Sequence, residues 1–442
     1  MSAFADHRPV TGSDPARQMV LPAWVGTSPS LATSLISMFD GERQPLYPQT
    51  VPFIAHAGSL AGEAFHYPYE VGYAYERLPG DLFAPRFGSG LERWSPLLPP
   101  LLPGLSCGEG ATPLVKAPQA AAWAGVPELV IKDESANPTW SHKDRLSLCT
   151  VSAAAAAGAM GTIISSSGNH GASAAAYSAR AGLKCIVLCD DGVSGAHARQ
   201  MRAYGAAVVA MPRAARWPLL DVLSHQPGWY LIGNTAPTHT GHPFGPEGYK
   251  TIAYELFLES GRVPAAVSIP TSYGELLFGI GKGFAELKAL GLTKDEPMLI
   301  AAEPEGSAAI GRLYGGGSPC TLEPGETIAH GIGSACGSFR GITALRRSRG
   351  LAIAVSDQDI ADAQAALGLD GLWSEPASAA GLAALRIAAR QALLPAGPVV
   401  HISTSTGLKE PHRAACEIPR ISHADWPELR SILTMSYHLP LD

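Results

Sequence analysis

Several common signals are missing from this sequence. Its 442 residues carry 32 Lys and Arg against 38 Asp and Glu, a formal net charge of −6 at pH 7, and this mildly acidic balance predicts no nucleic-acid partner. No apolar run approaches the roughly 20 residues that a membrane span needs. The start of the chain lacks the charged-then-apolar pattern of a secretion signal. These absences predict a cytoplasmic protein without a membrane partner.

Cysteine is scarce and scattered. None of the seven cysteines belongs to a Cys-x-x-Cys pair, and none precedes Cys107. A metal-binding ribbon in the first hundred residues is therefore excluded, and we expect no metal site. The odd number and wide spacing of the cysteines suit a reducing compartment better than a disulfide framework.

Strand-like and helix-like patterns alternate through the middle of the chain. A hydrophobic fraction of 46% suits a sizeable core. Strand-like runs at 161–164 and 185–188 alternate with helix-like runs at 172–181 and 197–204, and this βαβ periodicity implies a parallel sheet. Further strands are predicted at 128–133, 207–210, 265–270, 298–303 and 399–402, and further helices at 248–256 and 278–290 and from Ser356 onward.

Two short segments carry the strongest chemical signal. Lys143 lies in Asn137–Arg145, NPTWSHKDR, and a polar, glycine-rich turn follows at Ser165–Gly171, SSSGNHG. The turn opens a predicted helix, so its free backbone N–H groups and the helix dipole favour an anion. A lysine followed by this turn resembles the pyridoxal-phosphate enzymes of the tryptophan synthase β-subunit superfamily, also called fold type II.

The wider pattern is similar to the threonine synthase branch of that superfamily. The similarity runs from about residue 90 to residue 415, with the segments in the expected order. Besides the two segments above, it rests on GEGATP at 108–113, EGYKTIAYE at 247–255, ETIAHGI at 326–332, EPASAA at 375–380 and TSTGLKEP at 404–411.

The resemblance implies a fold and a division into domains. It implies an α/β protein with a two-lobed, three-layer α/β/α open sheet and an active site between the lobes. Residues 101–142 and 235–420 would form a large domain that binds pyridoxal 5'-phosphate, and 143–234 a small mobile α/β domain. Residues 1–100, rich in Pro, Gly, Tyr and Phe, are expected to form an irregular N-terminal extension, and 421–442 a C-terminal tail. A homodimer is expected by family analogy.

The resemblance also implies roles for single residues. Lys143 matches the lysine that holds the cofactor as a Schiff base and, once released, acts as a base. Ser166, Ser167 and Asn169 match the loop that binds the substrate carboxylate, and the Asn169 side chain would also contact the ring oxygen of the cofactor. Thr404 matches the hydroxyl that faces the pyridine nitrogen. Because a neutral hydroxyl does not hold that nitrogen protonated, elimination or replacement is favoured over transamination.

The segment that would hold the cofactor phosphate departs from the family pattern. The family has a loop like Gly-Asn-Gly-Gly-Asn, whereas this chain has Ser272, Tyr273 and Gly274, followed by Glu275. Glycines let backbone N–H groups approach an anion closely. Ser272, Tyr273 and Gly274 remain the predicted phosphate site, and Glu275 would repel a phosphate unless it points away.

A second departure concerns the substrate. Threonine synthases of this branch have an arginine that grips the phosphate of O-phosphohomoserine, and its position falls at Gly245, while Tyr249 replaces a glutamine. Loss of the arginine removes a major source of phosphate recognition. Lys250, with His239 and His242, could supply other anion contacts or could be ordinary polar residues at a lobe junction.

A third departure flanks the lysine. The family's Gly-Ser-Phe-Lys becomes Trp140-Ser-His142-Lys143. His142 could join proton transfer or bind the cofactor phosphate, although adjacent side chains tend to diverge. His170 lies in the carboxylate loop and could contact a leaving group or nucleophile.

The sequence thus predicts a pyridoxal-phosphate-dependent lyase or synthase that acts on an amino acid, a small-molecule substrate, by elimination and replacement at Cβ or Cγ. It would be similar to threonine synthase, with a substrate that could differ from O-phosphohomoserine. One alternative is a β-eliminating or β-replacing enzyme of specialised metabolism, such as a serine/threonine dehydratase-like enzyme or a synthase that uses O-phosphoserine or O-acetylserine. Another is a non-catalytic binding partner with the same fold, which the retention of Lys143, Asn169 and Thr404 argues against.

Overall fold

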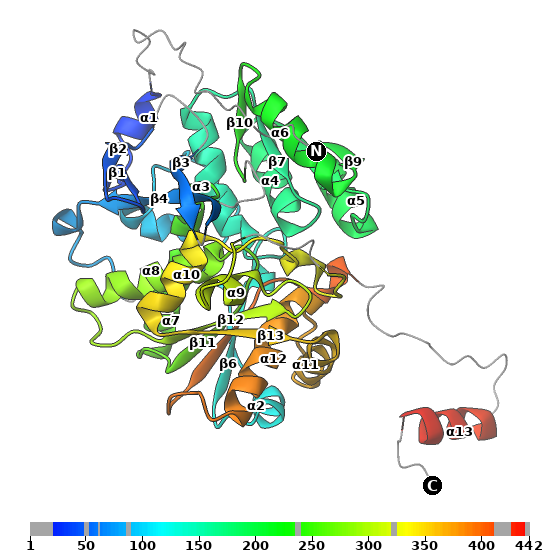
Figure 1. Ribbon diagram of the computed structural model, residues 1–442. Helices are drawn as coiled ribbons and strands as arrows, with labels where there is room; N and C mark the ends of the chain where they lie inside the picture. Colours follow the sequence, from blue (N-terminus) through cyan, green and yellow to red (C-terminus); the bar gives the residue numbers. More distant parts are fainter. Residues whose placement is uncertain are drawn as a thin grey trace. The chain divides into compact units, whose positions relative to one another are not determined.

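A computed structural model describes residues 21–47, 53–60, 62–84, 90–234, 240–319, 325–410 and 426–437 (Figure 1). The chain divides into two units, Met1–Lys409 and Glu410–Asp442. The described part of the second unit contains helix α13 (Trp426–Tyr437). Among the described residues, no helix is both long and apolar enough to cross a membrane.

The larger sheet has six strands in the order β13-β12-β11-β14-β6-β5, and all neighbours are parallel except β5 and β6. Its central strand β11 is buried along its whole length, as expected for a parallel sheet covered on both faces. The strands are β5 (Leu114–Lys116), β6 (Leu129–Asp133), β11 (Ala266–Pro270), β12 (Met298–Pro304), β13 (Leu351–Val355) and β14 (Val399–Ser403).

Alternate residues of these strands enter two different hydrophobic clusters. In β12, Leu299 packs with residues of the helices α7, α8 and α10, whereas Ile300 packs with residues of α2, α11 and α12. Neighbouring strand residues point to opposite faces of a sheet, so the sheet lies between two helical layers. The helices are α2 (Pro118–Ala124), α7 (Gly245–Ser260), α8 (Glu275–Ala289), α10 (Phe339–Ser348), α11 (Asp357–Leu369) and α12 (Pro376–Arg390).

The smaller sheet is entirely parallel, with the order β10-β7-β8-β9. Its strands are β7 (Gly161–Ser165), β8 (Lys184–Asp190), β9 (Ala207–Met211) and β10 (Trp229–Leu231). The helices α4 (Asn169–Arg180), α5 (Gly195–Ala203) and α6 (Arg216–Ser224) connect them. Two separate sheets with helices between their strands confirm the predicted α/β fold class. The smaller sheet lies within residues 143–234, the predicted small domain.

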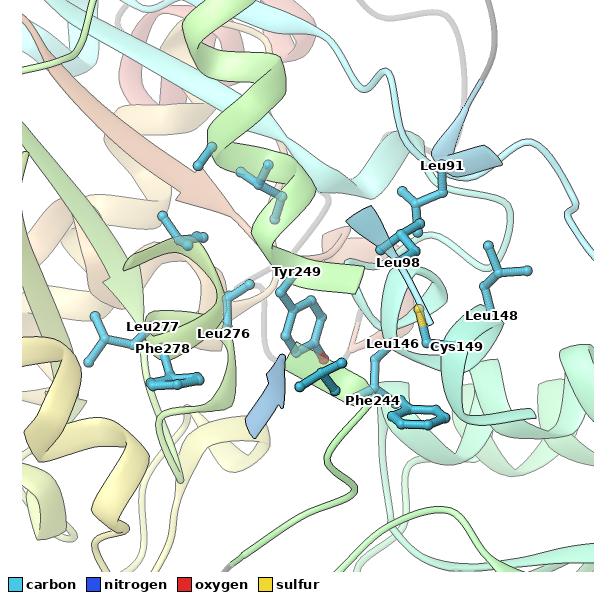
Figure 2. Close-up of a cluster of buried hydrophobic side chains, with 14 of the residues drawn as sticks. Leu91, Leu98, Leu146, Leu148, Cys149, Phe244, Tyr249, Leu276, Leu277 and Phe278 are labelled. Carbon is cyan, nitrogen blue, oxygen red and sulfur yellow. The ribbon is translucent and has the colours of Figure 1, made fainter. Parts of the chain in front are cut away.

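Helix α3 (Lys143–Ala156) links the two parallel parts of the fold. It packs against α4, which belongs to the smaller sheet, and against α7, which covers the larger sheet. Figure 2 shows the core at this junction, where Leu146 of α3 lies near Tyr249 of α7 and Leu276 of α8. Two glycines let α7 and α8 approach closely. A Cβ at Gly279 would lie 2.6 Å from the Pro246 carbonyl oxygen, and one at Gly283 would lie 2.3 Å from that of Lys250.

The description of residues 1–100 as irregular is wrong for the part that the structure describes. This part contains an antiparallel sheet with the order β2-β1-β4-β3, because apolar and aromatic residues alternate inward along its longest strand. Prolines and glycines hide that pattern in the sequence. The strands are β1 (Ala32–Ser37), β2 (Arg43–Pro45), β3 (Ile54–Leu60) and β4 (Glu63–Tyr73).

The N-terminal sheet is attached to the body by buried polar contacts. The Tyr73 hydroxyl donates to Glu247 Oε2 at 2.9 Å, and Lys282 Nζ donates to the Val71 carbonyl at 2.6 Å. A further tyrosine hydroxyl, that of Tyr75, donates to Glu286 Oε1 at 2.7 Å. The extension is therefore part of the same compact unit as the sheets that follow it.

The predicted strands β6, β7, β8, β9, β11, β12 and β14 are all present with ends within two residues of the predicted ones. The predicted N-cap of α11 is also confirmed, because the Ser356 side chain accepts from the Asp359 N–H at 3.1 Å. The cysteines agree only in part with the expected lack of a disulfide framework. Cys107, Cys149, Cys185 and Cys189 are free, but Cys336 is disulfide-bonded.

Candidate active site

Lys143 begins helix α3 beside the carboxyl end of β14. The backbone N–H of the preceding His142 donates to the Thr404 carbonyl at 3.0 Å, and Ser141 forms a β-bridge with Ser405. These contacts hold two segments together that are about 260 residues apart in the chain. Lys143 and Thr404, both predicted to contact the cofactor, are thus brought close to each other.

The electrostatic setting of Lys143 suits a reactive amine. Burial lowers the pKa of Lys143 below its usual range, while the carboxylates of Glu275 and Glu375 oppose that shift. Its Nζ lies 5.5 Å from the centroid of the Tyr249 ring. A desolvated amine loses its proton more readily, and the neutral amine is the nucleophile that attacks a carbonyl carbon.

The Asn169 side chain, at the start of α4, is held on both sides. Its Nδ2 donates to both carboxylate oxygens of Glu375 at 3.0 Å, and its Oδ1 accepts from Lys409 Nζ at 2.7 Å and from Ser405 Oγ at 3.2 Å. The segments EPASAA and TSTGLKEP were noted for their resemblance, but no role had been predicted for Glu375 or Lys409. They connect the predicted carboxylate loop to the larger lobe.

Ser166 and Ser167 use their hydroxyls to shape the turn. Ser166 Oγ accepts from the N–H groups of Gly168 at 3.3 Å and Gly171 at 3.0 Å, and Ser167 Oγ accepts from the Asp190 N–H at 2.8 Å. The free N–H groups at the start of α4 remain the groups that can meet an anion. Substrate contact by the two serine side chains stays a prediction.

Thr404 has a partner that the sequence did not reveal. Its Oγ1 lies 2.7 Å from the hydroxyl of Ser378, in the first turns of α12. Ser378 Oγ also accepts from the N–H groups of Thr404 at 2.9 Å and Ser405 at 2.8 Å. With both lone pairs used, Ser378 Oγ has only its own proton to give, for which Thr404 Oγ1 and the Ser405 carbonyl, at 3.2 Å, are the acceptors. In either case the Thr404 proton is left available for an acceptor in the site.

The predicted phosphate segment forms a tight turn into helix α8. Gly274 has φ 86°, and a Cβ there would lie 2.6 Å from Gly341 Cα, so only glycine fits. The Ser338 hydroxyl holds the turn by donating to the Tyr273 carbonyl. The N–H groups of residues 275–277 have no acceptor within the helix, which begins with the Phe278 N–H donating to the Gly274 carbonyl at 2.9 Å.

Glu275 lies at the first position of α8. Its side chain is 11% exposed, and its Oε1 lies 3.7 Å from Nη1 of Arg340. Burial raises the pKa of Glu275, and the charges of Arg340 and Lys143 oppose the rise. The Glu275 carboxylate is thus directed to the Arg340 guanidinium, a positive partner beside the predicted phosphate site.

The two predicted histidines are both neutral in this environment. Burial, followed by the charge of Lys143, lowers the pKa of His142 and of His170 well below 6.5. His142 Nδ1 lies 3.2 Å from the Thr404 carbonyl. His170 Nε2 and the Tyr249 hydroxyl are buried without a hydrogen-bond partner among the described residues, as expected for groups that meet a ligand.

The structure gives no support to a substrate contact by Lys250. Its Nζ pairs with Glu247 Oε2 at 2.8 Å and Glu286 Oε1 at 2.9 Å, and it lies 3.8 Å from the centroid of the Tyr73 ring. Glu247 lies on α7 and Glu286 on α8, so the contacts of Lys250 hold these two packed helices together. His242 Nε2 lies at hydrogen-bonding distance, 3.1 Å, from the Tyr230 hydroxyl. His239 lies outside the described residues.

Together these groups fit pyridoxal phosphate. Lys143 would offer a desolvated amine to its aldehyde, Thr404 would offer a proton to its pyridine nitrogen, and the turn closed by Gly274 would offer backbone N–H groups to its phosphate. The aldehyde, the ring nitrogen and the phosphate would thus each meet a complementary nucleophile or donor. The fit does not depend on any residue that lies outside the described ranges.

Comparison with known proteins agrees with this geometry. Residues 105–405 match the family described as "Pyridoxal-phosphate dependent enzyme", and the chain belongs to this family, whose cofactor is pyridoxal 5'-phosphate. Among curated relatives, the threonine synthase of Methanosarcina acetivorans is 32% identical over 353 residues, or 77% of this chain and 86% of that one. The threonine synthase of Methanocaldococcus jannaschii is 33% identical over 338 residues, or 74% and 82%.

Solved structures agree in fold. A fungal L-serine ammonia-lyase from Rhizomucor miehei superimposes with a TM-score of 0.58 and 24% identity, covering 67% of this chain and 93% of that one. Threonine deaminase isoform 2 from Solanum lycopersicum gives a TM-score of 0.57 and 20% identity, covering 73% and 86%. At this identity the likeness shows the fold alone, which is fold type II.

Proposed function

We propose that this chain is a pyridoxal-phosphate-dependent lyase or synthase that acts on an amino acid by elimination and replacement at Cβ or Cγ. One observation carries the proposal. A lysine amine with a lowered pKa stands beside Thr404, the Asn169 turn and the start of α8. Curated threonine synthases of similar length support the reaction class.

Each residue has a definable task in this reaction. When bound, the cofactor would supply a ring that acidifies the Cα–H bond of an attached amino acid. Lys143 would hold the cofactor and then, as a neutral amine, take the Cα proton. The N–H groups at the start of α4 would orient the substrate carboxylate. Thr404, supported by Ser378, would donate a hydrogen bond to the ring nitrogen without charging it.

The leaving group separates two versions of the proposal. Threonine synthesis would require loss of a γ-phosphate and addition of water at Cβ. A β-eliminating enzyme would instead lose a β-substituent and give a keto acid and ammonia, or a replacement product. The carboxylate of Glu275 beside Gly245, where the family carries an arginine, favours the second version. A homodimer and a cytoplasmic location complete the proposal.

A substrate panel tests this function. The cofactor-loaded protein is incubated with O-phospho-L-homoserine, L-serine, L-threonine and O-acetyl-L-serine, and phosphate, keto acid and ammonia are measured. We expect turnover of at least one of these amino acids and none with Lys143→Ala. A protein that binds a partner but turns over no amino acid, with or without Lys143, would have the fold but not the proposed activity.

A further inference from the structure

Gly245 and Tyr249 lie one helical turn apart at the start of α7, so both positions face the same side of that helix. This side is turned to the candidate site, because the Tyr249 ring centroid is 5.5 Å from Lys143 Nζ. A Cβ at Gly245 would lie 3.0 Å from Leu146 Cδ1 and 3.7 Å from Glu275 Oε1. An aliphatic side chain and a carboxylate therefore fill the space that a side chain at position 245 would need.

An acidic side chain, that of Glu275, lies on this side of the site. Glu275 keeps 11% of its side chain exposed, whereas Arg340 is 1% exposed. Arg340 also donates through both terminal nitrogens to backbone carbonyls, to Thr240 through Nη1 and to Tyr69 through Nη2 at 2.6 Å. A ligand in the site can thus meet the carboxylate, while the guanidinium behind it is engaged with the backbone.

Tyr249 adds a neutral donor to the same side. Figure 2 shows its ring among the side chains of Leu146, Phe244 and Leu276. Its hydroxyl is fully buried and has no hydrogen-bond partner in the described ranges. Burial, with the nearby carboxylate of Glu275, raises the pKa of Tyr249 well above 10, so the hydroxyl keeps its proton.

We infer that Gly245, Tyr249 and Glu275 select an amino acid whose side chain is uncharged and reject one that carries a phosphate. A phosphate dianion placed here would meet the Glu275 carboxylate at close range, whereas Arg340 is already engaged with backbone carbonyls. Like charges brought together discriminate strongly between ligands. A hydroxyl group can instead accept from Tyr249 or donate to Glu275. This inference rests on the proposed function and narrows its substrate class.

The test compares two ligands that differ by one phosphate. L-Homoserine and O-phospho-L-homoserine are titrated into the cofactor-loaded protein, and dissociation constants are taken from the change in cofactor absorbance. We expect homoserine to bind at least about tenfold more tightly. Glu275→Gln removes the charge at constant shape and should reduce the ratio to about threefold or less. A ratio measured on one protein preparation cancels any change in cofactor affinity.

Two further variants make the test decisive. Glu92→Gln, the same substitution at an exposed glutamate, should leave the ratio unchanged. Tyr249→Phe should weaken homoserine binding by at least about fivefold and leave that of the phosphorylated ligand unchanged, which keeps a test available if Glu275→Gln does not fold. Tighter binding of O-phospho-L-homoserine by the unaltered protein overturns the inference and leaves the proposed function intact. If neither these ligands nor serine and threonine change the absorbance, both fail.

Discussion

Lys143 and Arg145 stand two residues apart on α3, and their surroundings differ in almost every respect. Arg145 is fully buried and forms paired hydrogen bonds with Glu134, at 2.7 and 2.8 Å, and with Glu255, at 2.6 and 2.7 Å. Lys143 has carboxylates nearby but a lowered pKa. Next to it, Tyr249 and His170 hold polar atoms without partners in the described chain.

This difference separates a charged residue whose setting stabilises the fold, Arg145, from one whose setting suits chemistry, Lys143. Around Arg145, burial disfavours the charged form, but the carboxylates of Glu134 and Glu255 outweigh it and raise the pKa of the guanidinium. In return, Arg145 and Lys132 lower the pKa of Glu255 despite burial. Around Lys143, burial outweighs the neighbouring charges. A fully satisfied cluster stabilises the fold, whereas incompletely satisfied groups in a cleft are candidates for chemistry.

The largest expected effect is on activity at Lys143. Lys143→Ala should lower turnover at least about 10³-fold, because it removes both the attachment of the cofactor and the base. Stability of the cofactor-free protein should change little or increase, since a buried amine with a lowered pKa is lost. Steady-state rates test the loss of turnover, and denaturant unfolding tests the change in stability. Strong destabilisation with normal turnover would reverse the roles assigned to the two residues.

The matched change at Arg145 should act on stability. Arg145→Met leaves Glu134 and Glu255 buried without their partner, and we expect the free energy of unfolding to fall by about 3–5 kcal/mol. Urea unfolding of the cofactor-free protein measures it. Because Arg145 and Lys132 lower the pKa of Glu255, the contribution of that carboxylate is fully present above the usual pKa of a glutamate and is lost as the pH falls through the lowered pKa. A loss under about 1 kcal/mol would contradict the comparison.

Lys409 gives a pH test on the site side. Burial lowers its pKa to about 8, compared with about 10.4 for an unfolded chain. Between these values the unfolded protein binds more protons, so stability should rise with pH by up to about 3 kcal/mol. The difference in unfolding free energy between the unaltered protein and Lys409→Met should rise over the same interval. If it stays flat from pH 8 to pH 10.4, the lowered pKa is wrong.

Ser378→Ala should have the smallest effect. It removes the hydroxyl that positions Thr404, and we expect activity to fall about tenfold with a loss of about 1 kcal/mol in stability. Ser378→Thr should recover part of the activity because it restores the donor. Turnover and the cofactor absorbance of the two variants check this. Equal rates for all three proteins would mean that Thr404 needs no support.

The sequence predicted some parts of this comparison and not others. Local patterns sufficed for the strands β6, β7, β8, β9, β11, β12 and β14, but they missed β5, β10 and β13. They did not identify Glu375, Ser378, Arg340 or Lys409, because each reaches the site from another element, and a contact over 26 residues or more leaves no local pattern. Lys250 shows the converse case: its place in a family motif left substrate contact and a polar structural role both open, and folding places it between two carboxylates.

The central claim is that Lys143 holds the cofactor in this site. The protein is loaded with pyridoxal phosphate, reduced with borohydride and digested, and its peptides are analysed by mass spectrometry. The account predicts one stable phosphopyridoxyl addition, on Lys143, and none after Lys143→Ala. Modification of another lysine at full occupancy, with Lys143 unmodified, would contradict it.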